Sequence, residues 1–256
     1  MRTNYKRPNN SWQKVGKWYG KITEGEGHYY HKNVIIPKVL KILNINSKSK
    51  ILDLGSGSGI LGRSIGKEIN YTGIDLSTSL IKDAERQDKS INHKYIVGDA
   101  SNFDLKNKDY TDCIYILSFQ NMKNAENAIK YAVNHLATNG KLVLVLNHPA
   151  FRIPRQSSWQ IDSGNKTEYR RINKYMSNLE IPINMSPSDR NSELTWSYHY
   201  PISKIVEMIT TNGLLISRLE EWVSDKTSVG PASKMENVAR NEFPLFMTLV
   251  GVKQNL

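Results

Sequence analysis

A run of glycines directly after a short apolar segment constrains the fold of this 256-residue chain more than any other feature. Residues 51–54 (Ile-Leu-Asp-Leu) predict a buried strand, and Gly55, Gly57 and Gly59 follow it at alternate positions. Glycines permit a tight turn between a strand and a helix, and they let a ligand approach the backbone without meeting Cβ atoms. Apolar residues then recur at helical spacing between residues 60 and 69, so we expect a strand–turn–helix unit of an α/β sheet.

The same alternation of short apolar runs and helical periods continues along most of the chain. Further strands are predicted at 71–75, 94–97, 112–118, 141–146, 214–219 and 246–252, with helices at 77–87, 125–136 and 202–209. This order predicts an α/β fold with one doubly wound, seven-stranded sheet. Residues 147–198 lack a regular apolar period, so an irregular insert is expected after the fifth strand.

We therefore predict a single domain over residues 1–256. It divides into an N-terminal arm (1–33), a core (34–149 and 199–256) and a substrate cap inserted at 150–198.

Composition limits the compartment and the partners. The formal net charge is +11, which excludes an acidic or calcium-buffering protein and favours an anionic partner: nucleic acid, anionic lipid or a small anion. Lysine (24) outnumbers arginine (11), and 25 Asn and 25 Ile suggest that coding bias supplies much of this charge. A single cysteine, Cys113, excludes an internal disulfide framework and multi-cysteine zinc sites. No apolar run is long enough to span a bilayer, so we expect a reducing compartment, most simply the cytoplasm.

Three acidic residues accompany the glycine-rich turn. Asp53 precedes it, Asp75 ends the second predicted strand and Asp99 follows the third. Asp75 can accept hydrogen bonds from ribose hydroxyls, and Asp99 can accept one from an adenine amino group. Each acid alone can be a solvated strand-end residue, but together they favour a nucleoside cofactor. A dinucleotide fingerprint requires a glycine where this chain has Ile60, which disfavours a nicotinamide-dependent oxidoreductase.

The segments ILDLGSGSG, YTGIDLS and GDAS resemble motifs of the class I S-adenosylmethionine-dependent methyltransferases, with the resemblance covering roughly residues 34–149 and 199–256. The resemblance is greatest to the small-molecule (methyltransferase type 11-like) branch that includes quinone-biosynthesis C-methyltransferases. It implies a Rossmann-like sheet whose last strand is antiparallel. The run NHPAFRIPRQSSW at 147–159 is typical of a subgroup of predicted methyltransferases and indicates no substrate.

The resemblance also implies S-adenosyl-L-methionine as the cofactor, with S-adenosyl-L-homocysteine as its product. The residues that would contact the cofactor are Asp53, Gly55, Ser56 and Gly57 at the methionine part, Asp75 and Leu76 at the ribose, Asp99 and Ala100 at the adenine, and Leu117 and Ser118 nearby. In this family an aromatic-rich arm often closes over the cofactor, and Tyr30 or His31 would reach its carboxylate. Packing is an equally good explanation of the arm's aromatic residues, which include Trp12, Trp18 and Tyr19.

The substrate side is expected to combine the residues after the fourth strand with the cap. The candidates are Phe119, Gln120, Asn121, Arg152, Arg155, Trp159, Arg170, Arg171 and Trp196. Four of the eleven arginines fall between 152 and 171, and planar guanidinium groups suit a carboxylate or phosphate. The alternative is a solvated loop whose aromatic residues pack the cap onto the sheet.

Methyl transfer needs positioning and the exclusion of water, and it needs a base when the acceptor is a hydroxyl, phenol or activated carbon. His148 is the first candidate for that base and His199 the second, although either can simply pack. Tyr30 and His31 are further candidates. No metal-ligand spacing is visible, so no metal is expected.

The favoured hypothesis is a methyltransferase that moves a methyl group by in-line displacement to a small, anionic or aromatic acceptor. The second is a tRNA or rRNA methyltransferase that uses its positive charge to hold phosphates. A nucleic-acid partner is disfavoured because the sequence shows no basic tail and its basic residues are interspersed with acids. The third hypothesis is a non-catalytic protein that binds the cofactor.

Overall fold

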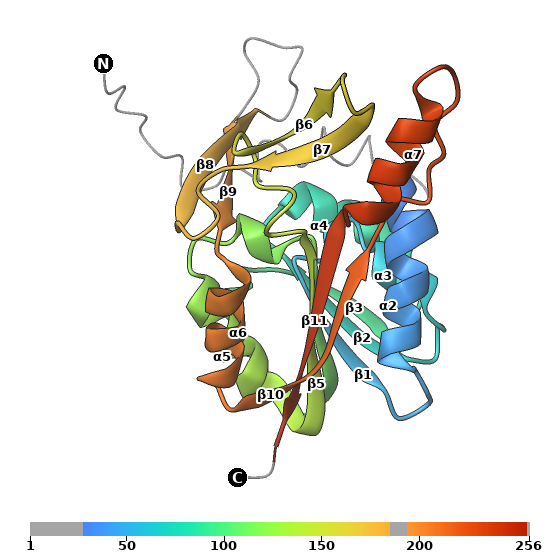
Figure 1. Cartoon of the computed structure of the whole chain (residues 1–256). Coiled ribbons are helices and arrows are strands. Elements are labelled where there is room, and N and C mark those ends of the chain that lie inside the picture. The colour runs from blue at the N-terminus through green and yellow to red at the C-terminus, as the bar shows by residue number, and fades with distance from the viewer. Residues whose placement is uncertain (1–27, 185–193, 255–256) are drawn as a thin grey trace.

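The computed structural model describes residues 28–184 and 194–254, and its centre is a seven-stranded sheet in the order β10-β11-β5-β4-β1-β2-β3 (Figure 1). The strands are β1 (Lys50–Leu54), β2 (Asn70–Asp75), β3 (His93–Val97), β4 (Tyr110–Ile116), β5 (Leu136–Asn147), β10 (Leu214–Trp222) and β11 (Phe246–Lys253). Strands β1 to β5 are parallel, and β11 runs antiparallel between β5 and β10. The predicted doubly wound sheet and its antiparallel last strand are thus confirmed.

Alternating apolar side chains explain why helices cover both faces of this sheet. In β5, Leu142, Leu144 and Leu146 belong to one core cluster, together with residues of α5 (Ala125–His135) and α6 (Ile202–Thr210). Val143 and Val145 belong to the other cluster, with α2 (Ile36–Leu43). A central strand that is apolar at every position must be covered on both faces, which is the basis of the doubly wound arrangement.

Short helices connect the first strands. Helix α3 (Ile60–Ser64) follows the glycine-rich turn, and α4 (Thr78–Gln87) links β2 to β3. Ser77 caps α4, because its side chain accepts a hydrogen bond from the Leu80 backbone N–H.

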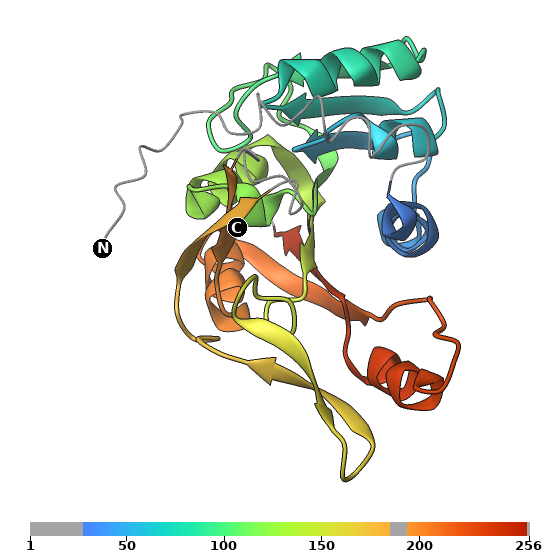
Figure 2. The same ribbon diagram turned by 90° about the horizontal axis from the view of Figure 1, so that it is seen from above.

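The insert after β5 is regular, which corrects the prediction of an irregular segment. Strands β6 (Ser157–Asp162) and β7 (Thr167–Ile172) form one antiparallel hairpin, and β8 (Leu179–Asn184) pairs with β9 (Leu194–His199). Figure 2 shows the β6–β7 hairpin projecting beyond the central sheet. Because most residues of β6 and β7 are at least partly exposed on both faces, these strands lack the apolar alternation that reveals a half-buried strand.

The segment 222–243, for which no helix or strand was predicted, contains the helix α7 (Ser233–Glu242), which lies against β7. Ala239 is the one buried residue of this helix. A helix that is polar on nearly all sides has no apolar stripe to mark it in the sequence.

The described part of the N-terminal arm leads into the core through one turn of π-helix, η1 (His31–Ile35), followed by α2 with Pro37 in its first turn. Trp12, Trp18 and Tyr19 lie outside the described residues. Over residues 28–184 and 194–254, no helix combines the length and the apolar character that crossing a membrane requires.

Candidate functional site

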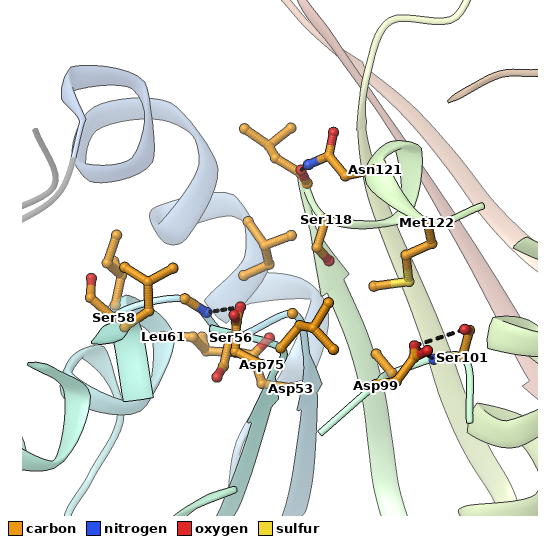
Figure 3. A pocket seen from close by; sticks show the side chains of 18 of the residues that line it. Asp53, Ser56, Ser58, Leu61, Asp75, Asp99, Ser101, Ser118, Asn121 and Met122 are labelled. Carbon is orange, nitrogen blue, oxygen red and sulfur yellow. Dashed lines mark hydrogen bonds between the residues drawn. The ribbon is translucent and has the colours of Figure 1, made fainter. Parts of the chain in front are cut away.

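A cavity of about 390 Å³ opens at the carboxyl ends of the parallel strands. Its wall combines the glycine-rich turn after β1, the end of β2, the loop after β3, the turn after β4 and the inserted strand β9. Ligands of doubly wound sheets bind at this edge, and the volume lies within the range of small-molecule sites. Figure 3 shows the acidic and hydroxyl side chains that converge there.

The glycine-rich turn depends on backbone conformations that favour glycine. Gly55 and Gly57 have φ angles of 80° and 56°. A Cβ atom at Gly55 would lie 2.4 Å from the Ser118 Cβ, whereas a Cβ at Gly57 would meet nothing within 4 Å. The Ser118 hydroxyl donates a 2.6 Å hydrogen bond to the Leu54 carbonyl. Gly55 therefore allows the ends of β1 and β4 to meet, and Gly57 leaves open space beside the turn.

Two of the predicted acidic residues organise the cavity wall. The Asp75 carboxylate accepts hydrogen bonds from the backbone N–H groups of Gly57, at 2.9 Å, and Ser77, at 2.8 Å. The Oδ1 atom of Asp99 accepts from both the backbone N–H and the hydroxyl of Ser101 (Figure 3). The carboxylates are thereby held in place at the ends of β2 and β3.

Three buried polar atoms of the cavity wall have no hydrogen-bond partner among the described residues: His31 Nδ1, Asp53 Oδ1 and Ser56 Oγ. The three residues are 8%, 2% and 8% exposed, respectively. The other oxygen of Asp53, Oδ2, accepts a 2.7 Å bond from the Tyr71 hydroxyl. Buried polar groups are nearly always paired in folded proteins, so this concentration of unpaired atoms indicates a ligand site.

Burial shifts the pKa values of two of these groups. Desolvation raises the pKa of the Asp53 carboxyl to about 7, although the hydrogen bond from Tyr71 opposes the shift. Desolvation, together with the nearby His28, lowers the pKa of His31 to about 4, so its imidazole is neutral at physiological pH.

Leu117 adds a strained backbone at the end of β4. It has a φ of 53°, its N–H donates to the Val145 carbonyl at 2.8 Å, and its carbonyl accepts from the Asn121 side chain at 3.2 Å. A left-handed conformation is costly for leucine and is typical of functional sites. Leu117 and Asn121 both line the cavity.

Most residues predicted to contact the cofactor come together in this cavity. Those that line it are Asp53, Gly55, Ser56, Gly57, Asp75, Leu76, Asp99, Ala100, Leu117 and Ser118, with Asn121 and Trp196 from the predicted substrate side. Tyr30 is not among them, because its hydroxyl bonds to Ser224 at 3.1 Å and its ring packs on Phe246. The adjacent His31 lines the cavity instead.

Further lining residues were not identified from the sequence: Ile36, Ser58, Ile60, Leu61, Leu80, Ser101, Met122, Lys123, Asn124 and Tyr198. Ser101 could have been identified from the sequence, because it directly follows the GDA segment. Tyr198 could be identified as a lining residue only once β9 was known. In this strand Trp196 and Tyr198 share a face because side chains alternate along a strand.

A second cavity of about 40 Å³ adjoins the first, and Tyr198 lines both. Phe119, Gln120, Arg152 and His199 line this smaller cavity. The structure thus separates the predicted substrate residues into those that face the large cavity and those that face its neighbour.

Neither His148 nor His199, the first two candidates for the base, lines the large cavity, whereas the further candidate His31 does. The His148 Nδ1 accepts bonds from the backbone N–H groups of Ala150 (3.1 Å) and Phe151 (3.3 Å), which leaves Nε2 to donate to Glu221 at 2.6 Å. The His199 Nε2 donates to the Tyr175 carbonyl at 2.8 Å. Burial lowers the pKa of both imidazoles. The contacts of His148 hold the first turn of the insert against β10.

The remaining residues predicted to bind the substrate, Arg155, Trp159, Arg170 and Arg171, line neither cavity. The Arg170 guanidinium stacks over the Trp159 ring at 4.8 Å and donates to the Phe151 carbonyl. Arg155 and Arg171 are exposed. These residues hold the hairpin together or face solvent.

Comparison with known proteins agrees with this geometry. Residues 51–140 match the model of a family described as a methyltransferase domain. The chain is 30% identical, over 117 residues, to a carboxy-S-adenosyl-L-methionine synthase of Staphylococcus epidermidis, covering 43% of this chain and 51% of that protein. It is 27% identical, over 107 residues, to a demethylmenaquinone methyltransferase of Thermotoga maritima, covering 41% and 45%. The chain thus spans about half the length of the curated relatives it matches.

Solved structures share the fold over most of the chain. An S-adenosylmethionine-dependent methyltransferase from Mesorhizobium loti superposes with a TM-score of 0.66 at 18% identity, covering 84% of this chain and 96% of that one. A glycopeptide N-methyltransferase in complex with S-adenosylmethionine superposes with a TM-score of 0.56 at 16% identity, covering 86% and 92%. At these identities the likeness is one of fold.

Proposed function

We propose that this chain is an S-adenosylmethionine-dependent methyltransferase that acts on a small acceptor. The observation that carries the proposal is the set of buried atoms on His31, Asp53 and Ser56 that lack a partner among the described residues, in the wall of a cavity that Asp75 and Asp99 also line. The methyltransferase-domain match over residues 51–140 supports the same function.

The unpaired atoms fit an amino-acid head group. A carboxylate at Asp53 suits an ammonium group, and the hydroxyl of Ser56 and the neutral imidazole of His31 can each donate a hydrogen bond to a carboxylate. The fixed carboxylates of Asp75 and Asp99 suit the hydroxyl and amino groups of a nucleoside. A molecule that joins an amino acid to adenosine matches both sets of groups.

When bound, S-adenosylmethionine supplies an electrophilic methyl group on a sulfonium centre. The chain's own residues then bind and orient the cofactor and the acceptor, and they exclude water. Gly55 and Ser118 hold the ends of β1 and β4 together in the cavity wall, and Asn121 holds the Leu117 carbonyl there. Trp196 and Tyr198 of β9 close the cavity from the inserted hairpin.

The acceptor would enter between β9 and the turn after β4, beside the smaller cavity. Neither His148 nor His199 is assigned the role of base. Both nitrogens of His148, and Nε2 of His199, bond to protein groups away from the large cavity. An acceptor that is already deprotonated, or that loses its proton to solvent, needs no such base.

The test uses S-adenosylmethionine labelled in its methyl group and the purified full chain, with a cell extract as the source of acceptors. We expect label in small molecules that pass a size-exclusion filter, and none when Asp53→Asn replaces the wild type. Label precipitated with RNA would favour the RNA methyltransferase. Tight cofactor binding with no transfer to any fraction would favour the non-catalytic alternative and contradict the proposal.

A further inference from the structure

The smaller cavity contains a cation without an acidic partner. Arg152 lines this cavity and is half-buried, and its Nη1 donates to the Asn147 side-chain oxygen at 2.8 Å. Its guanidinium also lies 5.4 Å from the centre of the Phe246 ring. Within residues 28–184 and 194–254, no carboxylate forms an ion pair with Arg152.

The surroundings of Arg152 include a second cation. Burial and the nearby Arg170 both lower the pKa of Arg152, as expected where a second cation approaches and solvent is excluded. Arg170 donates to the Phe151 carbonyl and the Ser157 hydroxyl, which are neutral groups, and the charge of Glu168 acts on Arg170 to raise its pKa. A partly desolvated Arg152 beside a second cation is costly, and a bound anion would offset that cost.

A polar amide also faces this space. The Gln120 Oε1 is buried without a partner among the described residues, and Gln120 lines the cavity beside Arg152. Because the amide can rotate, Gln120 can present either its oxygen or its N–H groups to a ligand. The volume of about 40 Å³ exceeds the space that a single water molecule needs and suits one small charged group.

We propose that the smaller cavity is an acceptor subsite in which Arg152, with Gln120 beside it, binds an anionic oxygen group, a carboxylate or a phosphate. Tyr198, which lines both cavities, places that subsite next to the cofactor cavity, so the anion would sit at one end of the acceptor and the methylated atom at the other. Arg152 is thus a specificity-determining residue, and this role rests on the proposed function.

The test measures binding to the full chain saturated with S-adenosylhomocysteine, by isothermal titration with benzoate, phenyl phosphate and the neutral benzamide. We expect at least one anion to bind saturably and benzamide to bind at least about 10-fold more weakly. Whichever of benzoate and phenyl phosphate binds more tightly identifies the anionic group. Equal binding of benzamide, or no saturable binding of either anion, would overturn the proposal.

Matched variants locate the binding site. Arg152→Gln should weaken the anion at least about 10-fold and leave the affinity for S-adenosylhomocysteine within about twofold of the wild type. Arg171→Gln, at an exposed position on β7, should behave as the wild type. If Arg152→Gln does not fold, Arg152→Lys keeps the charge but not the paired N–H geometry, and it should still weaken the anion by about threefold or more. An unchanged affinity in the folded variant would overturn the proposal.

The same titrations separate this inference from the proposed function. If S-adenosylhomocysteine does not bind, the proposed function fails. The anion titrations of the cofactor-free protein then still decide whether Arg152 binds an anion.

Discussion

The Asp75 Oδ2 accepts a 2.9 Å hydrogen bond from the Gly57 backbone N–H, so the end of β2 holds the glycine-rich turn that follows β1. Its Oδ1 accepts a second bond from the Ser77 N–H at the start of α4. One carboxylate therefore fixes both the glycine-rich turn and the start of α4 beside the cavity. This double contact requires two acceptor oxygens.

Replacing Asp75 by asparagine should weaken cofactor binding. An amide offers one acceptor oxygen, so either the Gly57 or the Ser77 N–H loses its partner, and the ribose contact changes as well. We expect the dissociation constant for S-adenosylhomocysteine, measured by calorimetry, to rise at least about 10-fold. Asp104→Asn, at a side chain that is 77% exposed, is the control. Equal affinities in the two variants would contradict the assigned role of Asp75.

The glycines of the turn should differ in their tolerance of alanine. At Gly55, a Cβ would clash with Ser118 and separate β1 from β4, so Gly55→Ala should destabilise the fold by about 2 kcal/mol or more. At Gly57, the Cβ has space, and the left-handed backbone costs about 1 kcal/mol. Chemical denaturation followed by circular dichroism measures both. Equal losses of stability would show that the approach of β1 to β4 is not what requires Gly55.

Asp53 should make stability and cofactor binding respond to pH in opposite directions. Its pKa is about 7 in the folded chain and 3.8 for an ordinary aspartate, so the unfolded chain releases this proton first as pH rises. The contribution of Asp53 to stability therefore decreases from about pH 4 to pH 7 and remains unfavourable above it. Binding of an ammonium group should instead strengthen over this range, because it requires the carboxylate.

Asp53→Asn tests both directions. The variant should unfold at a temperature about 2 °C or more above the wild type at pH 8, and this difference should shrink toward pH 4. Its affinity for S-adenosylhomocysteine should be weaker and should lose the rise between pH 6 and pH 8. A wild-type affinity that falls over that interval would contradict the role of Asp53.

His148 should matter for stability rather than for the cofactor. His148→Leu removes the acceptor of two buried N–H groups and the donor to Glu221, so we expect a loss of about 2 kcal/mol in unfolding free energy. Its affinity for S-adenosylhomocysteine should stay within about twofold of the wild type. Glu221→Gln, which keeps an acceptor for Nε2, should be milder. A variant with full stability but no methyl transfer would place His148 in the chemistry instead.

The cofactor side of the site could be predicted because its residues directly follow predicted strands. Asp53, Gly55, Asp75 and Asp99 each lie at or next to the end of a strand, and parallel strands bring such ends to one edge of the sheet. Local patterns were therefore sufficient to predict which of these side chains come together.

The substrate side could not be predicted in the same way, because it depends on contacts between distant segments. His148 reaches Glu221, 73 residues later, across β11, which separates β5 from β10. Trp196 and Tyr198 reach the large cavity from β9, which pairs with β8, while Arg152 lines the smaller cavity from the turn before β6. The exposed hairpin β6–β7 and the polar helix α7 carry no apolar period from which they could have been inferred.

The proposed function requires the large cavity to bind an amino-acid nucleoside. Isothermal titration of the full chain with S-adenosylhomocysteine, and in parallel with NAD, tests this. We predict saturable binding of one S-adenosylhomocysteine per chain and no heat of binding with NAD. Binding of NAD without binding of S-adenosylhomocysteine would contradict the proposed function.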